Sequence, residues 1–67
     1  MKNKRLIQKR RELKLTQKQV ALAIEISQSM LSLAESGDRT LDDINKIKIA
    51  KFYRVTVEWL FFEEFYD

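Results

Sequence analysis

The sequence contains four serines as candidate nucleophiles: Ser27, Ser29, Ser32 and Ser36. A catalytic serine needs a neighbouring base, usually histidine, and the sequence contains neither His nor Cys. The carboxylates are dispersed along the chain, and there is no glycine-rich phosphate loop. Without His and Cys the usual zinc ligands and disulfides are also excluded. The sequence therefore predicts a protein that is not an enzyme and that holds no metal or cofactor.

The charges are distributed unevenly along the chain. Residues 1–18 contain eight Lys or Arg residues against a single acid, Glu12, whereas residues 58–67 contain four acids and no base. A basic segment suits a polyanion and an acidic segment repels one. The charge alone is equally consistent with the solvated face of a helix.

Length and composition predict one small domain that spans residues 1–67. Pro is absent, Gly occurs only at Gly37, and apolar residues never alternate as they would in a strand. We therefore expect an all-α fold, a compact five-helix bundle. No apolar run reaches the roughly 18 residues of a membrane span, and the basic N-terminus lacks the features of a secretory signal. These absences predict a cytoplasmic protein that does not contact a membrane.

Capping residues and apolar spacing place the five helices. The expected helices cover about residues 4–14, 16–23, 27–35, a stretch from Thr40 or Asp42 to Tyr53, and a short segment after Thr56. Thr16 with Gln19 forms a capping-box pattern, and Gly37 suits the left-handed residue that ends a helix. The positions expected to face inward are Leu6, Ile7, Arg10, Leu13, Val20, Ala21, Ile24, Leu31, Ala34, Val57, Leu60 and Phe61.

The fourth expected helix has apolar residues on two sides. Leu41, Ile44 and Ile47 form one stripe, and Ile49, Ala50 and Tyr53 lie on a different azimuth. This pattern predicts either burial on both sides or an apolar strip that a partner chain covers.

Residues 16–36 contain the pattern of a helix-turn-helix unit. Two short helices, each preceded by a capping residue, are joined by about three residues, and the small side chain of Ala21 allows a close crossing. Ile26 and Leu31 can pack beneath both helices. The second helix of such a unit can enter the major groove of DNA.

The chain resembles the Cro and phage-repressor helix-turn-helix proteins, the Xre-like family, over roughly residues 5–61. Its matching stretches are Arg10 with Leu13, Leu15-Thr16-Gln17, Val20-Ala21, Ile26-Ser27-Gln28-Ser29, Leu31-Ser32, Glu35 with Gly37, and Val55-Thr56-Val57-Glu58-Trp59-Leu60. The resemblance implies a transcriptional regulator, most simply a repressor, that binds double-stranded DNA through the helix at about 28–36.

The resemblance also implies roles for individual residues. Arg10 and Glu35 match an ion pair between the first helix and the recognition helix. The DNA contacts that it implies lie at Gln17, Lys18, Ser27, Gln28, Ser29, Ser32, Leu33 and Arg39. Gln17 would hold a phosphate, and Gln28 could pair with adenine. Lys18 and Arg39, like Lys9 and Arg11, are candidates for sequence-neutral phosphate contacts, and each is equally consistent with a charge that serves surface solubility.

Three positions depart from the family pattern. Glu25 and Arg54 stand where glycine is usual, and a positive φ at Glu25 would cost about 1 kcal/mol or more. The fourth helix is also about two residues longer than the common pattern. Within the expected DNA-facing surface, Leu33 stands where the family often has a polar side chain that contacts a base. Met30 would contact either a base or a neighbouring helix.

Aromatic residues crowd the C-terminal segment: Trp59, Phe61, Phe62, Phe65 and Tyr66. They are more than a terminal turn can bury, which favours a homodimer formed through residues 59–67. An alternative function is a protein-interaction module of the same fold, antitoxin-like or anti-repressor, which Glu25, Met30, Leu33 and the apolar tail would support. No small-molecule ligand is indicated.

Overall fold

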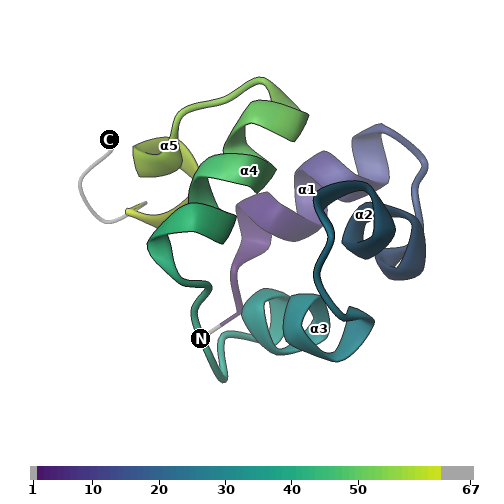
Figure 1. Ribbon diagram of the computed structural model, residues 1–67. Helices are drawn as coiled ribbons and strands as arrows, with labels where there is room; N and C mark the ends of the chain where they lie inside the picture. The colour runs from purple at the N-terminus through teal and green to yellow at the C-terminus, as the bar shows by residue number, and fades with distance from the viewer. Residues whose placement is uncertain (1, 63–67) are drawn as a thin grey trace.

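The computed structural model describes residues 2–62, and these residues form five α-helices without a strand. The helices are α1 (Lys4–Glu12), α2 (Gln17–Ile24), α3 (Gln28–Ser36), α4 (Asp43–Tyr53) and α5 (Val57–Phe61). Figure 1 shows α3 along one side of the bundle and α5 at the end away from α2, with α4 in contact with both α2 and α5. The prediction of an all-α, five-helix fold is confirmed.

Each helix begins at a residue whose side-chain oxygen accepts the amide hydrogen three positions later. These residues are Asn3, Thr16, Ser27, Asp42 and Thr56. The capping box of Thr16 and Gln19 is complete, with both reciprocal bonds present. Asp42, not Thr40, begins α4. Local side-chain chemistry therefore sets the start of every helix.

The first four helices end in a different way, through a residue in the left-handed region. Lys14, Glu25, Gly37 and Arg54 have φ values of 58°, 62°, 84° and 58°. After each of them, the next amide reaches back five positions to a helix carbonyl, as in Ile26 N to Ala21 O at 2.9 Å. Glu25 and Arg54 thus adopt the glycine-like conformation that the family pattern implied.

The inward faces of α2 and α3 are buried as expected, at Val20, Ala21, Ile24, Leu31 and Ala34. Leu13 was expected to face inward as well, and this is wrong because 48% of it is exposed. The helix stops at Glu12 and Leu13 is its C-cap, and after the left-handed Lys14 it is Leu15 that packs against the core.

The apolar residues of α4 are buried on one side only. Ile49, Ala50 and Tyr53 lie in the core, whereas Ile44 and Ile47 are 67% and 48% exposed. Leu41 is buried, but it precedes the helix. Of the two sequence-based alternatives, burial on both sides is therefore wrong.

Helices α2 and α3 form the helix-turn-helix unit. Residues 25–27 make the turn between them, and Ile26 packs against the core from within it. Within residues 2–62, no helix has the length and apolar character needed to cross a membrane.

Candidate nucleic-acid interface

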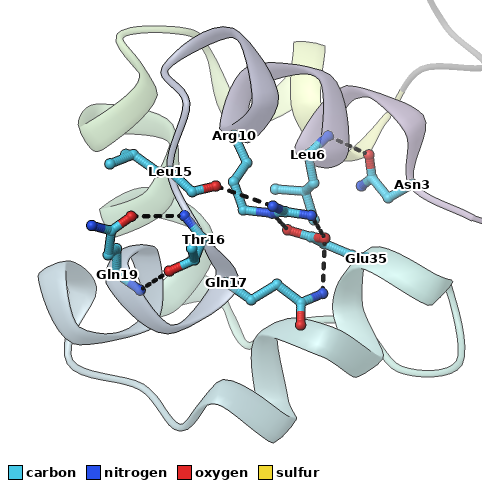
Figure 2. Close-up of polar contacts among 8 residues, drawn as sticks. All are labelled: Asn3, Leu6, Arg10, Leu15, Thr16, Gln17, Gln19 and Glu35. Atoms are coloured by element: carbon cyan, nitrogen blue, oxygen red, sulfur yellow. Dashed lines mark hydrogen bonds and ion pairs between the residues drawn. The ribbon is translucent and has the colours of Figure 1, made fainter.

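A two-point ion pair joins α1 to the end of α3 (Figure 2). Arg10 Nε donates to Glu35 Oε2 at 2.8 Å, and Arg10 Nη2 donates to Glu35 Oε1 at 3.0 Å. The side chains are only 15% and 4% exposed. The hydrogen bonds to Glu35 raise the pKa of Arg10, against the opposing effect of burial. The pair implied by the family resemblance is present in the structure.

The same pair reaches the start of α2. Gln17 Nε2 donates to Glu35 Oε1 at 3.1 Å, and Arg10 Nη1 donates to the Leu15 carbonyl at 3.1 Å. Figure 2 shows the carboxylate of Glu35 between the guanidinium and the Gln17 amide. The first turn of α2 is thereby held in a fixed position relative to α3.

Five of the eight expected DNA contacts surround one shallow, open depression of about 430 Å³. Its lining residues are Gln17, Gln28, Ser29, Ser32 and Leu33. Gln28, Ser29 and Ser32 are exposed, and Leu33 is 39% exposed. The structure thus gathers amide and hydroxyl groups from α3 beside the N-terminus of α2, and we call this surface the α3 face.

The other three expected contacts lie outside that depression. The Ser27 hydroxyl accepts the Met30 amide hydrogen at 3.0 Å, so the hydroxyl is engaged in capping α3. Lys18 is exposed in the first turn of α2. Arg39 is exposed and lines a separate depression with Met30 and Leu33.

Met30 and Glu25 are placed away from the centre of the α3 face. Met30 Sδ lies 3.9 Å from Asn45 Nδ2, so this side chain contacts a neighbouring helix, one of the two alternatives for it. Glu25 lines a third depression, together with Lys48 and Lys51. The acid of the turn therefore shares its surroundings with basic residues of α4.

The two basic residues of α1 that were expected to contact phosphate, Lys9 and Arg11, differ in whether an acid of the same chain pairs with them. Lys9 Nζ lies 3.1 Å from Glu12 Oε1, and Gln8 Nε2 donates to Glu12 Oε2 at 2.9 Å. These hydrogen bonds, first from Gln8 and then from Lys9, lower the pKa of Glu12. Lys9 is thus paired with an acid, whereas Arg11 is exposed.

The C-terminal aromatics are partly used inside the protomer. Trp59 and Phe61 pack against the core, and the Arg5 guanidinium lies 4.6 Å from the Trp59 ring. Lys46 Nζ lies 5.4 Å from the Phe62 ring, which is 37% exposed. Phe65 and Tyr66 lie outside the described residues.

Sequence reasoning missed the role of Asn3. Its backbone N donates to the Glu35 carbonyl at 2.9 Å. In its side chain, Nδ2 donates to the Leu60 carbonyl at 2.9 Å, and Oδ1 accepts from Leu6 N at 3.0 Å. An asparagine directly before a predicted helix is a capping signal that was available. Its tertiary bonds, like the bond from Gln17 to Glu35, have no local signature.

Within the bundle, a three-residue turn joins α2 to the capped helix α3. This arrangement defines a helix-turn-helix protein. The chain belongs to the helix-turn-helix family of the Cro and C1 type, which includes Xre-like proteins, because the family model matches residues 6–60. It is accordingly a DNA-binding helix-turn-helix regulator. The chain matches no curated protein and no solved structure.

Proposed function

We propose that this regulator is a repressor that reads operator sequence in the major groove with α3. The observation that supports this most is the α3 face, where Gln28, Ser29 and Ser32 are exposed beside the N-terminus of α2. A helix of this kind presents its first turns to base edges.

The side chains of the α3 face suit direct reading of base pairs. The Gln28 amide carries a donor and an acceptor at the spacing of the adenine N7 and N6 groups. Ser29 and Ser32 can donate or accept, so they match several base edges. Leu33 supplies an apolar surface for the methyl group of thymine.

The start of α2 supplies the phosphate contact in this proposal. The first amides of a helix have no partner within the helix, and they favour an anion. The Gln17 amide nitrogen carries two hydrogens, and one of these serves Glu35. Phosphate is then bound by the second Gln17 hydrogen, the backbone amides and the nearby Lys18. Arg39, which follows the other end of α3, provides a further phosphate contact.

The proposed operator is a two-fold sequence bound by a homodimer. A two-fold dimer places its recognition helices about 34 Å apart, one turn of DNA. The sequence predicts that Trp59, Phe61, Phe62, Phe65 and Tyr66 form the dimer contact, and this stays a prediction. Trp59 and Phe61 already contact the core of their own protomer.

Selection of bound sequences from random duplex DNA tests the proposal. A palindromic consensus is expected, together with an affinity that falls with salt at a log–log slope of about −0.9 per phosphate contact. Placing that consensus upstream of a reporter gene, with the protein supplied in trans, should lower expression. A chain that shifts no duplex but binds a partner protein independently of salt would be the interaction module instead. Met30 gives that alternative less support than its sequence position suggested, since it lies against Asn45.

A further inference from the structure

Two partly exposed apolar side chains are neighbours on α3. Leu33 is 39% exposed and Met30 is 43% exposed. They are three positions apart in the helix, so they lie next to each other on its surface. Leu33 borders both the α3 face and a second depression of about 240 Å³, which Met30 also lines. We call these two residues the α3 apolar pair.

Leu33 is not directed toward the core. The buried apolar residues of α3 are Leu31 and Ala34, and a period of 3.6 residues places Leu33 on the opposite side of the helix. Its neighbours on that side, Ser29 and Ser32, are polar and exposed. An exposed leucine within a polar surface that faces DNA is stabilised by contact only where the DNA is itself apolar.

Met30 is held in place by the first turn of α4. Its Sδ accepts from Asn45 Nδ2 at 3.9 Å. The polar side chains of the second depression bond to backbone groups. Thr40 Oγ1 donates to the Leu41 carbonyl at 3.5 Å. Asp42 Oδ1 accepts from Asn45 N at 2.9 Å. The α3 apolar pair therefore forms a fixed apolar surface between the α3 face and the start of α4.

The major groove offers one kind of apolar group to such a surface. Its base edges carry hydrogen-bond donors and acceptors, and the apolar group among them is the 5-methyl group of thymine. A donor or acceptor placed against leucine loses its water without gaining a hydrogen bond, which is unfavourable. Methylation of cytosine adds a methyl group at the same ring position. Thymine and 5-methylcytosine therefore share the group that fits the α3 apolar pair.

We propose that Leu33 binds the 5-methyl group of one pyrimidine, with Met30 beside it as a positioning residue, so that methylation of cytosine at this position strengthens DNA binding. This inference rests on the proposed function, because it requires α3 to lie in the major groove. Arg39, which is exposed and lines the second depression, binds a phosphate beside the same base. Burial of one methyl group corresponds to about a fourfold change in affinity.

Removal of the methyl group from the DNA tests this inference with the natural chain. In the duplex selected from random sequences, each thymine is replaced in turn by deoxyuridine, which lacks only the 5-methyl group. The dissociation constant is measured by fluorescence anisotropy. At one position the replacement should weaken binding by about fourfold. If no position responds, the proposal is overturned.

Variants of the chain separate contact with Leu33 from effects of the methyl group on the DNA itself. Leu33→Ala should bring the ratio of the deoxyuridine to the thymine dissociation constant to about one, and Met30→Ala should lower it in part. Leu22→Ala is the matched control, because Leu22 is 70% exposed on α2 and should leave the ratio at about four. Each ratio is taken within one variant, so a general loss of affinity does not change it. A ratio that stays at about four in Leu33→Ala would overturn the proposal.

Methylated DNA distinguishes the two sources of the methyl group. At the position that responds, a C·G pair is tested with and without a methyl group on the cytosine. The methylated duplex should bind about fourfold more tightly, and Leu33→Ala should abolish this difference. If methylation gives no increase in affinity, the proposed response to cytosine methylation is wrong and the site is restricted to thymine.

Failure of this inference can be told apart from failure of the proposed function. A natural chain that binds no duplex would refute DNA reading by α3. A chain that selects a consensus sequence, but whose affinity depends on neither methyl group, would refute the role of the α3 apolar pair and leave DNA reading supported.

Discussion

Arg10 and Glu35, which are 25 positions apart in the sequence, form a bidentate ion pair with N–O distances of 2.8 and 3.0 Å. Through Glu35 the same pair holds Gln17, and through Arg10 it holds the Leu15 carbonyl. One buried carboxylate near the end of α3 thus holds the start of α2 against α3, and the α3 face is built from these two helices.

Arg10→Met should be strongly destabilising, because it leaves the buried carboxylate of Glu35 without its cation. We expect a loss of about 3–5 kcal/mol in the free energy of unfolding, measured by urea denaturation. The double variant Arg10→Met with Glu35→Leu is the control, and it should recover most of the loss because no buried charge is left unpaired. A loss below about 1 kcal/mol in the single variant would show that solvent or another group compensates Glu35.

Glu25→Gly should stabilise the protein. Glu25 has φ 62°, and a non-glycine residue in the left-handed region costs about 1–2 kcal/mol. Its acid also stands at the negative end of the α2 dipole. Thermal unfolding should show a rise in Tm, of about 4–8 °C for each kcal/mol gained in a domain of this size.

Gly37→Ala is the matched control for this prediction, since Gly37 has φ 84° at the end of α3. Here the change introduces a Cβ where the backbone disfavours one, so Tm should fall. A fall in Tm for Glu25→Gly would mean that the Glu25 side chain contributes more than its conformation costs.

Gln28→Ala and Arg39→Ala should affect DNA binding in different ways. Loss of the Gln28 amide should relax the selected consensus at one position, at a cost of about 1–3 kcal/mol for the preferred base. Loss of Arg39 should weaken binding to all sequences alike and reduce the magnitude of the salt slope by about one. Sequence selection and salt titration of both variants check this, and equal, sequence-independent losses would remove Gln28 from the base readers.

Tyr53→Phe should reduce the decrease in the free energy of unfolding that accompanies a rise to alkaline pH. Tyr53 is 3% exposed, and its hydroxyl has no hydrogen-bond partner among the described residues. Burial first, and then the charge of Glu35, raise its pKa above the ordinary 10.0. The folded-state pKa lies above the unfolded one, so this contribution to stability is complete below pH 10 and is lost as the pH rises above it.

Urea denaturation at a series of pH values above and below 10 checks this prediction. Below pH 10, Tyr53→Phe should be neutral or stabilising, since it removes an unpaired buried hydroxyl. If the free energy of unfolding falls equally steeply with pH above 10 in the variant and in the natural chain, other groups cause the loss of stability.

The starts of the helices were predictable because capping chemistry is local. Thr16, Ser27 and Thr56 stand directly before their helices and accept amide hydrogens three residues on. The ends were harder to place. Only one of the four left-handed residues is glycine, so Lys14 gave no signal and the first helix was predicted two residues too long.

The sequence predicted which residues form the candidate site better than it predicted how they contact one another. The family spacing identified Gln17 and Gln28 as candidates, and both line one depression. The bond from Gln17 to Glu35 and the contact of Met30 with Asn45 depend on how separate helices pack. Helical periodicity describes one helix at a time, so it cannot specify such contacts.

Asn3 joins parts of the chain that are far apart in sequence, because its side chain bonds both to α1 and to the carbonyl of Leu60. The beginning of α1 and the last turn of α5 are therefore neighbours. A short peptide could connect them covalently, and the chain could be opened instead in the exposed stretch 37–40 that follows α3. Such a circular permutation would carry the recognition helix at the new C-terminus, where another module could be fused directly behind it.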